Sequence, residues 1–359
     1  MRTFLRVTAV VAVIIGLQGQ RGTQAQELME LQQGPPTDVA APAQSLVQVP
    51  VRAGFPRLTV ATPTGFTHAM PTVAGTAARR AAGALAGPLL YHAGGSVVLP
   101  FPQIYSIYWV PPALQNGGST GYSANYPGLT FFASAFYPSH GLDNNNTQYY
   151  QTIGGTTTYI NNFGGPVGVY FDSNPLPASG CTDTATPGNC ITDAQIQAEI
   201  TRVMGVNGWT GGLNKIFVLF TSSGEGSCFT SASTSCAYTQ YCAYHGSYSS
   251  GGTTVLYANM PYANTSVCQA SGQTEPNGDV GDLTASVLSH EISETITDPL
   301  GNAWFDASGN EIGDLCNFNF GTNTWAGPMA AANQMWNGFF FEMQQEWDNH
   351  TGTCVQVGP

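Results

Sequence analysis

The sequence predicts a mixed α/β (α+β) fold: a layered single domain with a mixed sheet, stabilised by disulfide bonds. Beyond residue 89, short apolar runs typical of strands alternate loosely with stretches of helical spacing. Hydrophobic residues make up 42% of the 359 residues, which is enough to form a substantial core. All eight cysteines lie beyond residue 180, and an even number of cysteines in an exported chain is typical of disulfides.

The first residues predict a secretory signal peptide over residues 1–25. Arg2 and Arg6 supply a basic start, an apolar run extends over 7–17, and Thr23-Gln24-Ala25 forms a small-residue cleavage site. An apolar run of about 11 residues is too short to span a bilayer. We therefore expect a secreted, extracellular protein with no membrane association after the signal is removed.

Residues 26–88 predict a linker or pro-segment, because they are rich in Ala, Pro, Gln and Gly and show no sustained strand or helix period. Within them, Arg79-Arg80 belongs either to a short helix or to a dibasic processing site. Residues 89–359 are then expected to form a single metal-binding domain that is also a candidate for catalysis.

Apolar runs and their breakers define the elements expected in that domain. Strands are expected within 96–110, 167–171, 215–221, 253–260 and 339–347, while 128–137 is apolar and ambiguous. Helices are expected over 192–204 and over 282–297, the second with Asp282 as its N-cap and Pro299 just beyond its end. A hairpin that turns at Ser308-Gly309-Asn310 is expected over 304–313.

The charge distribution excludes two classes of partner. Lys and Arg number 9 against 21 Asp and Glu, which gives a net charge of −12. Beyond residue 80, Arg202 and Lys215 are the only basic residues apart from histidine. Because a protein with so few basic residues cannot neutralise phosphates, we expect neither nucleic-acid binding nor docking to anionic membranes.

The most informative segment is Ser289–Asp298, which reads as an acidic helix. At about 100° per residue, one arc of this helix collects a histidine and three carboxylates and the opposite stripe is apolar. The arc holds His290, Glu291, Glu294 and Asp298. An amphipathic surface helix is the simple interpretation, but residues 275–314 contain nine acids and no Lys or Arg. A bound cation would relieve this repulsion, and so would an acidic habitat that protonates the carboxylates.

His290-Glu291-x-x-Glu294 resembles the zincin signature His-Glu-x-x-His, with a glutamate in place of the second histidine. This spacing predicts His290 and Glu294 as ligands of one ion and Glu291 as the general base that holds the attacking water. A catalytic zinc requires a third protein ligand. The candidates are Asp298, Asp306, Glu311 and Asp314, of which Asp314 or Glu311 is preferred. Zinc is the expected metal, and calcium or manganese is the alternative because the donors are hard.

Two cysteine pairings are expected: Cys181 with Cys190, and Cys316 with Cys354. The alternative for Cys236 and Cys242 is a zinc knot with His245, which is less typical of an exported chain than disulfides.

Several segments, in conserved order from residue 89 onward, resemble the phosphate-induced protein 1 / EXORDIUM family of exported proteins. They are Tyr91–Gly95, Ile104–Trp109, Ile216–Leu219, Tyr244–Gly246, Pro276–Gly281, Ala285–Leu288 and Asp298–Asn302. The resemblance implies export and a cell-wall association, and it supplies no catalytic residues.

Two functions are therefore expected as alternatives. The first is an exported metal-dependent hydrolase, most simply a zincin-like metallopeptidase that acts on a peptide or protein substrate. The second is a non-enzymatic extracellular protein of the cell wall that binds glycan and holds a structural calcium ion. Glu342 and Glu346 are a weaker candidate for a glycosidase acid–base pair.

Overall fold

The structure is a computed structural model, which describes residues 58–62, 64–120, 144–232, 235–279, 281–336 and 338–359. All of these belong to a compact unit that spans residues 45–359. The predicted signal peptide and the ambiguous segment 128–137 lie outside the described residues.

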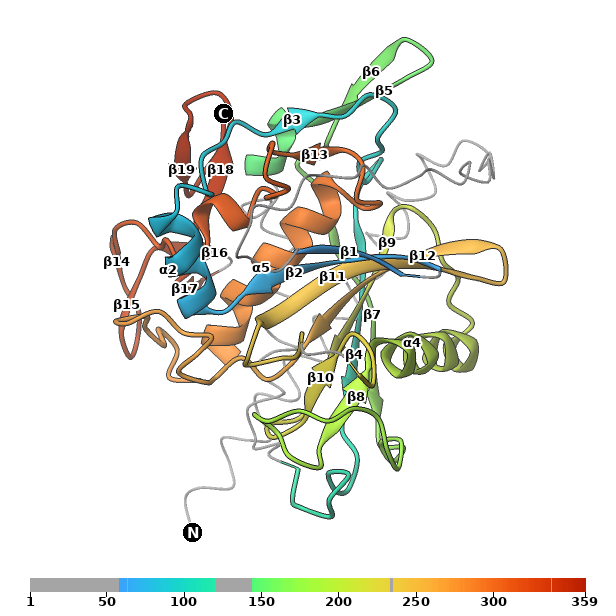
Figure 1. Ribbon diagram of the computed structural model, residues 1–359. Coiled ribbons are helices and arrows are strands. Elements are labelled where there is room, and N and C mark those ends of the chain that lie inside the picture. The colour runs from blue at the N-terminus through green and yellow to red at the C-terminus, as the bar shows by residue number, and fades with distance from the viewer. Residues whose placement is uncertain (1–57, 63, 121–143, 233–234, 280, 337) are drawn as a thin grey trace. The chain divides into compact units, whose positions relative to one another are not determined.

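A seven-stranded mixed sheet forms the centre of this unit (Figure 1), as the sequence predicts. In spatial order its strands are β1 (Thr59–Thr62), β2 (Gly65–Pro71), β11 (Tyr241–Ser250), β12 (Thr253–Met260), β9 (Lys215–Phe220), β4 (Gln103–Trp109) and β7 (Gly165–Asp172). The pairs from β1 to β12 are antiparallel, whereas β12, β9, β4 and β7 run parallel to one another.

Two helices cover opposite faces of the sheet, α4 (Asp193–Asn207) and α5 (Gly281–Thr297). Side chains alternate along each strand, so β9 sends Ile216 and Val218 into the core beneath α5 and Phe217 into the core beneath α4. The result is a three-layer domain with one apolar core on each face of the sheet.

The helix boundaries follow local capping. Thr192 and Gln195 form a capping box at the start of α4. Helix α5 begins at Gly281, and the side chain of Asp279 accepts a hydrogen bond from the Gly281 amide. The predicted N-cap, Asp282, instead lies in the first turn, where its carboxylate binds the backbone and side-chain amides of Asn277.

Small elements surround the central sheet. The two-stranded pairs are β3 (Leu90–Tyr91) with β13 (Trp304–Phe305), β5 (Tyr150–Ile153) with β6 (Thr156–Tyr159), β8 (Cys190–Thr192) with β10 (Gly226–Cys228), β14 (Trp325–Ala326) with β15 (Ala331–Ala332), β16 (Gln334–Trp336) with β17 (Phe339–Phe341), and β18 (Glu346–Asp348) with β19 (Thr353–Val355). Helix α2 (Val73–Ala81) and the short helices η2 (Asn145–Gln148) and η3 (Asp314–Cys316) complete the set.

The C-terminal region covers the side of α5 that faces away from the sheet. Leu315, Phe341 and Met343 join the same core cluster as Ile292 of the helix. Every residue of α5 is therefore buried. This packing rules out the surface-helix interpretation and encloses the acidic arc inside the protein.

Two predicted elements differ in detail. The turn at 306–310 forms, but β13 pairs with β3 instead of closing the expected hairpin. The strand expected over 339–347 is interrupted, since Glu342 to Gln345 separate β17 from β18. Glu342 and Glu346 consequently do not lie on one strand.

Residues 58–88, expected to be mostly without a core of their own, contribute β1, β2 and α2 to the domain. Strand β2 pairs along its length with β11, and its Phe66 and Met70 are buried. This short strand acquires its core from its neighbours in the sheet, so its sequence carries little periodic signal.

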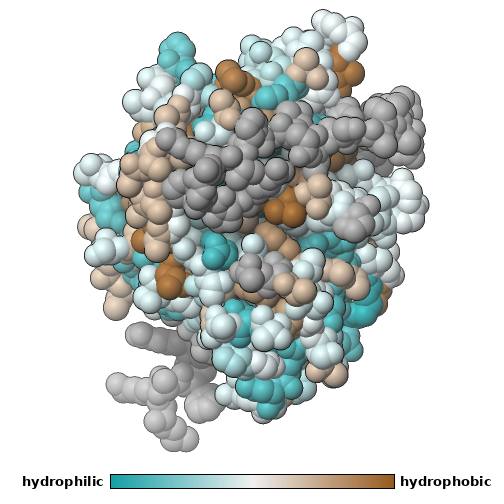
Figure 2. All heavy atoms as spheres, viewed as in Figure 1, coloured by the Kyte–Doolittle hydropathy of each residue, from teal (hydrophilic) through white to brown (hydrophobic). Residues whose placement is uncertain are grey.

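All eight cysteines form disulfides, which confirms the predicted pairs Cys181–Cys190 and Cys316–Cys354. The other two are Cys228–Cys236 and Cys242–Cys268, so neither Cys236 nor Cys242 has a thiolate free for a zinc knot. Four disulfides fit an extracellular protein. Among the described residues, no helix has the length and apolar character needed to cross a membrane. The face in Figure 2 shows hydrophobic residues as small patches between polar ones.

Candidate metal centre

Two histidines of the sheet face helix α5. His68 in β2 and His245 in β11 are direct partners across the antiparallel pair, and both side chains are 0% exposed. Each belongs to a strand on which alternate residues turn toward α5, so the strand pairing places both imidazoles on one face.

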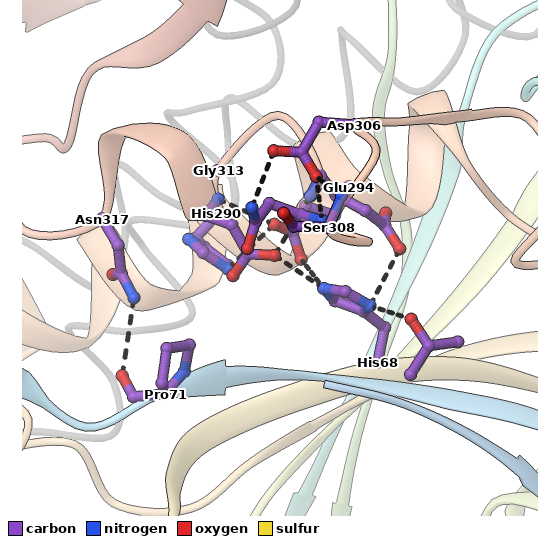
Figure 3. A network of polar contacts seen from close by, with 12 residues as sticks. His68, Pro71, His290, Glu294, Asp306, Ser308, Gly313 and Asn317 are labelled. Carbon is purple, nitrogen blue, oxygen red and sulfur yellow. Dashed lines mark hydrogen bonds and ion pairs between the residues drawn. The ribbon is translucent and has the colours of Figure 1, made fainter. Parts of the chain in front are cut away.

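Carboxylates reach these histidines from two further elements. Helix α5 supplies Glu291 and Glu294, the loop after β13 supplies Glu311, and the first residue of η3 supplies Asp314. The Asp306 carboxylate accepts hydrogen bonds from the backbone amides of Ser308 and Asn310 and so fixes the loop (Figure 3).

The His68 ring points from β2 into the cluster and contacts carboxylates through both nitrogens (Figure 3). Its Nε2 lies 2.8 Å from Asp314 Oδ2, and its Nδ1 lies 3.1 Å from Glu311 Oε1 and 2.7 Å from Thr59 Oγ1. Burial lowers the pKa of His68, but the negative charges of Asp314 and its neighbours outweigh burial and raise it above its usual value.

His245 touches three glutamates. Its Nδ1 lies 3.3 Å from Glu291 Oε2 and 3.6 Å from Glu294 Oε2, and its Nε2 lies 3.7 Å from Glu311 Oε2. Burial, and then the charges of His68 and His290, hold the pKa of His245 well below its usual value. A neutral imidazole is the form that ligates metal ions.

Many donor atoms in the cluster have no hydrogen-bond partner. Burial, followed by the neighbouring carboxylates, raises the pKa values of Glu291 and Glu311 well above their usual range. The unpartnered atoms include Glu291 Oε1, Glu294 Oε2, Glu311 Oε2, Asp314 Oδ1, His245 Nε2, His290 Nε2, Asp298 Oδ2 and both oxygens of Glu346. Buried polar atoms without hydrogen-bond partners are costly, and here several of them lie in one cluster.

His290 contacts Glu294 from the side. The amide of Gln344 is oriented by two backbone contacts, because its Oε1 accepts from Phe318 N and its Nε2 donates to Gly313 O. That Nε2 also lies 3.0 Å from His290 Nδ1, which must then accept. The other ring nitrogen, Nε2, lies 3.1 Å from Glu294 Oε1 and has no hydrogen-bond partner.

Two further carboxylates lie around the cluster. Asp298 Oδ1 accepts from the amides of Asn302 and Ala303 and closes the turn after α5. Burial raises the pKa of Asp298 to about 7. Burial, and then the charges of Glu294 and Asp314, raise the pKa of Glu346 well above its usual range.

Among the described residues, donor atoms converge in three groups, of which one consists of the disulfide-bonded Cys181, Cys190 and Cys228. The other two groups share a glutamate: His68, Glu294 and Asp314, and His245, Glu294 and Glu311. In each group the three atoms lie within 4.8 Å of one another. Three of the predicted ligands, Glu294, Glu311 and Asp314, are thus brought together. His290, Asp298 and the predicted base Glu291 lie beside these groups and belong to neither.

Sequence reasoning missed the first histidine and assigned the second to a different kind of site. His68 lies in the expected linker, and His245 entered only as a zinc-knot alternative. The available signal is the alternation Phe66, His68, Met70, which marks His68 as facing the core once 65–71 is recognised as a strand.

A pocket of about 270 Å³ adjoins the strand that carries His68. Its walls include Ala69 and Pro71 of β2, Arg79 of α2, and Tyr241 of β11. Asp314 and Asp306 act electrostatically on the Arg79 guanidinium, although burial is the larger influence and lowers the pKa of Arg79. The pocket therefore lies near enough to the cluster for its carboxylates to act on one lining residue, Arg79.

The chain is locally similar to Protein EXORDIUM-like 3 of Arabidopsis thaliana, with 50% identity over 52 residues. The match covers 13% of this chain and only 15% of the length of that protein. No protein-family model and no solved structure matches the chain. The local similarity and the four disulfides together fit an extracellular protein.

Proposed function

We propose that the protein is an exported metal-dependent hydrolase that acts on peptide or protein substrates. The observation that carries the proposal is the buried cluster itself, in which two imidazoles and four carboxylates contact one another at no more than 1% exposure. Uncompensated buried carboxylates are strongly unfavourable, and a divalent cation bound between them removes that cost.

The donor set favours zinc over calcium. Calcium takes six to eight oxygen ligands, whereas this cluster presents two imidazole nitrogens. Zinc binds nitrogen and carboxylate oxygen at about 2.0–2.2 Å, which corresponds to donor–donor spacings of about 3.3 Å in a tetrahedral site. The spacings from His68 Nε2, 2.8 Å to Asp314 Oδ2 and 3.9 Å to Glu294 Oε2, bracket that value.

Glu291 is the proposed general base. It contacts His245 through Oε2, while Oε1 has no hydrogen-bond partner and lies outside both donor groups. Burial and then the charge of Glu294 raise its pKa well above the usual value, which favours uptake of a proton by this carboxylate. A bound zinc would supply a polarised water, and Glu291 would hold and deprotonate that water. His290 lies beside Glu294, with its Nε2 3.1 Å from Glu294 Oε1.

The test is the Glu291→Gln variant, assayed for casein hydrolysis and for zinc content. We expect activity to fall at least about 100-fold while bound zinc remains unchanged, because the amide cannot accept a proton. The matched control is Glu342→Gln, since Glu342 is also buried but binds Thr274 N and Asn323 Nδ2 away from the cluster. Retained hydrolysis in Glu291→Gln would remove this residue from the mechanism.

A second candidate function is favoured by the burial of the donors. A cluster that is closed to solvent suits a structural ion, so the chain would be a non-enzymatic wall- or glycan-associated protein stabilised by calcium. Chelator treatment separates the two functions. Loss of hydrolysis together with zinc indicates the enzyme, whereas calcium content and a lower melting temperature without any hydrolysis indicate the structural role.

A further inference from the structure

We infer that the centre holds two divalent ions bridged by the Glu294 carboxylate. This inference rests on the proposed metal-dependent function and deepens it. The first ion would lie among His68 Nε2, Asp314 Oδ2 and Glu294, and the second among His245, Glu311 and Glu294.

The shared ligand is identified by one oxygen. Glu294 Oε2 lies 3.9 Å from His68 Nε2 and 3.6 Å from His245 Nδ1, so it faces both histidines at once. It has no hydrogen-bond partner. The other oxygen, Oε1, is held by the Asp314 amide at 3.0 Å. One oxygen of this carboxylate is held by a hydrogen bond, and the other faces two imidazoles. Such a carboxylate is placed to bridge two metal ions.

Glu311 contacts both histidines. Its Oε1 lies 3.1 Å from His68 Nδ1 and its Oε2 lies 3.7 Å from His245 Nε2. The ring centroids of the two histidines are 5.5 Å apart. Paired catalytic ions typically lie about 3.5–4 Å apart, so one ion for each histidine fits the width of the cluster.

Charge balance gives an independent reason for two ions. The carboxylates that contact the two histidines are Glu291, Glu294, Glu311 and Asp314. When ionised they carry four negative charges, which two divalent cations neutralise. A single divalent ion would neutralise two of these four charges. Three of the carboxylates, those of Glu294, Glu311 and Asp314, belong to the two donor groups, and each of these three has an oxygen without a hydrogen-bond partner that a second ion would help to satisfy.

Metal stoichiometry tests the inference on the full-length secreted protein. Metal-free protein is titrated with Zn²⁺ alone, and bound zinc is measured by mass spectrometry after gel filtration. We expect two ions per chain in the wild type, one in His68→Ala and one in His245→Ala. The control His350→Ala alters an exposed histidine and should keep both ions. One ion in the wild type would overturn the two-ion centre and leave the proposed function standing, whereas no bound ion would overturn both.

A spectroscopic measurement needs no variant and so does not depend on a variant folding. The wild type is loaded with Mn²⁺ alone and its electron paramagnetic resonance spectrum is recorded. Two bridged Mn²⁺ ions should give a spin-coupled spectrum distinct from the six-line signal of an isolated ion. Two uncoupled Mn²⁺ signals per chain would overturn the shared position of Glu294.

Discussion

His68 and His245 are direct partners across β2 and β11, with ring centroids 5.5 Å apart. The register of one antiparallel strand pair therefore sets the spacing of the centre. Because side chains alternate between faces, a slip of one residue in β2 would turn His68 toward α4. The sheet holds the two imidazoles, and α5 and the following loop bring the carboxylates to them.

Gly313 lets its loop approach His290 closely, and this contact can be tested. A Cβ at residue 313 would lie 2.5 Å from His290 Nδ1, although the backbone φ of −75° suits any residue. We expect Gly313→Ala to destabilise the fold by about 1–3 kcal/mol through overpacking and to reduce bound metal. Chemical denaturation and metal analysis measure the two effects.

The matched control for that variant is Gly205→Ala in α4, where a Cβ meets nothing within 4 Å. This substitution should stabilise the protein by about 0.5–1 kcal/mol and leave metal content unchanged. Equal effects of the two variants would contradict a specific contact between Gly313 and His290.

Gln344 is predicted to be a positioning residue for the centre. Its amide contacts His290 Nδ1 at 3.0 Å, and the Nε2 of the same ring lies 3.1 Å from Glu294 Oε1. We expect Gln344→Met to weaken zinc affinity by about 10–100-fold, as is typical of residues that orient metal ligands. Competition with a zinc-sensitive dye measures the affinity. The neighbouring change Gln345→Met is the control, and an equal loss of affinity in both variants would argue against the role of Gln344.

The Cys316–Cys354 disulfide ties η3, which begins with Asp314, to β19. Replacing both cysteines by serine should cost about 2–5 kcal/mol of stability and also weaken metal binding, because Asp314 loses its anchor. Replacing Cys181 and Cys190 by serine should lower stability and leave metal binding intact. Denaturant titrations with and without zinc distinguish the two pairs, and a zinc affinity unchanged in the first variant would contradict the prediction.

The buried carboxyl group of Glu225, which is not part of the centre, should make the stability of the fold depend on pH. It is 0% exposed, neither carboxylate oxygen has a hydrogen-bond partner, and burial raises its pKa to about 8. Between its unfolded pKa of about 4.3 and 8, the unfolded chain releases a proton that the folded protein retains. Stability should therefore fall as the pH rises through this window, by at most about 1.4 kcal/mol per unit.

Glu225→Gln lacks this titration, so its stability relative to wild type should increase from pH 5 to pH 8. Other titrating groups cancel in the difference between the two proteins measured in the same buffers. A difference that stays constant over this range would show that Glu225 titrates alike in both states.

The sequence predicts the parts of the fold whose signals are local. Apolar β-branched residues mark β9 and β12, and the Thr192 capping box and helical spacing mark α4. It also predicts α5 and its acidic arc. It does not predict that α5 is buried on all sides, because burial depends on Phe341 and Met343 far along the chain.

For the candidate site, the acidic ligands were predictable and the histidines were not. Glu294, Glu311 and Asp314 lie in one acid-rich stretch without a basic residue, which draws attention to all three. His68 and His245 are single histidines in strands of mixed composition. They join the carboxylates only through the pairing of β2 with β11, a long-range contact that local patterns do not specify.

The dibasic pair Arg79-Arg80 lies in helix α2, between His68 and all the other donors along the chain. Arg79 is buried, so a protease would have to unwind α2 before cutting there. Such a cut would leave His68 on a short amino-terminal fragment and the other donor residues on the longer fragment. The pairing of β2 with β11 and the proposed ions would then hold the two fragments together. Loss of the short fragment would remove His68 from the centre, so processing at this position would inactivate the protein.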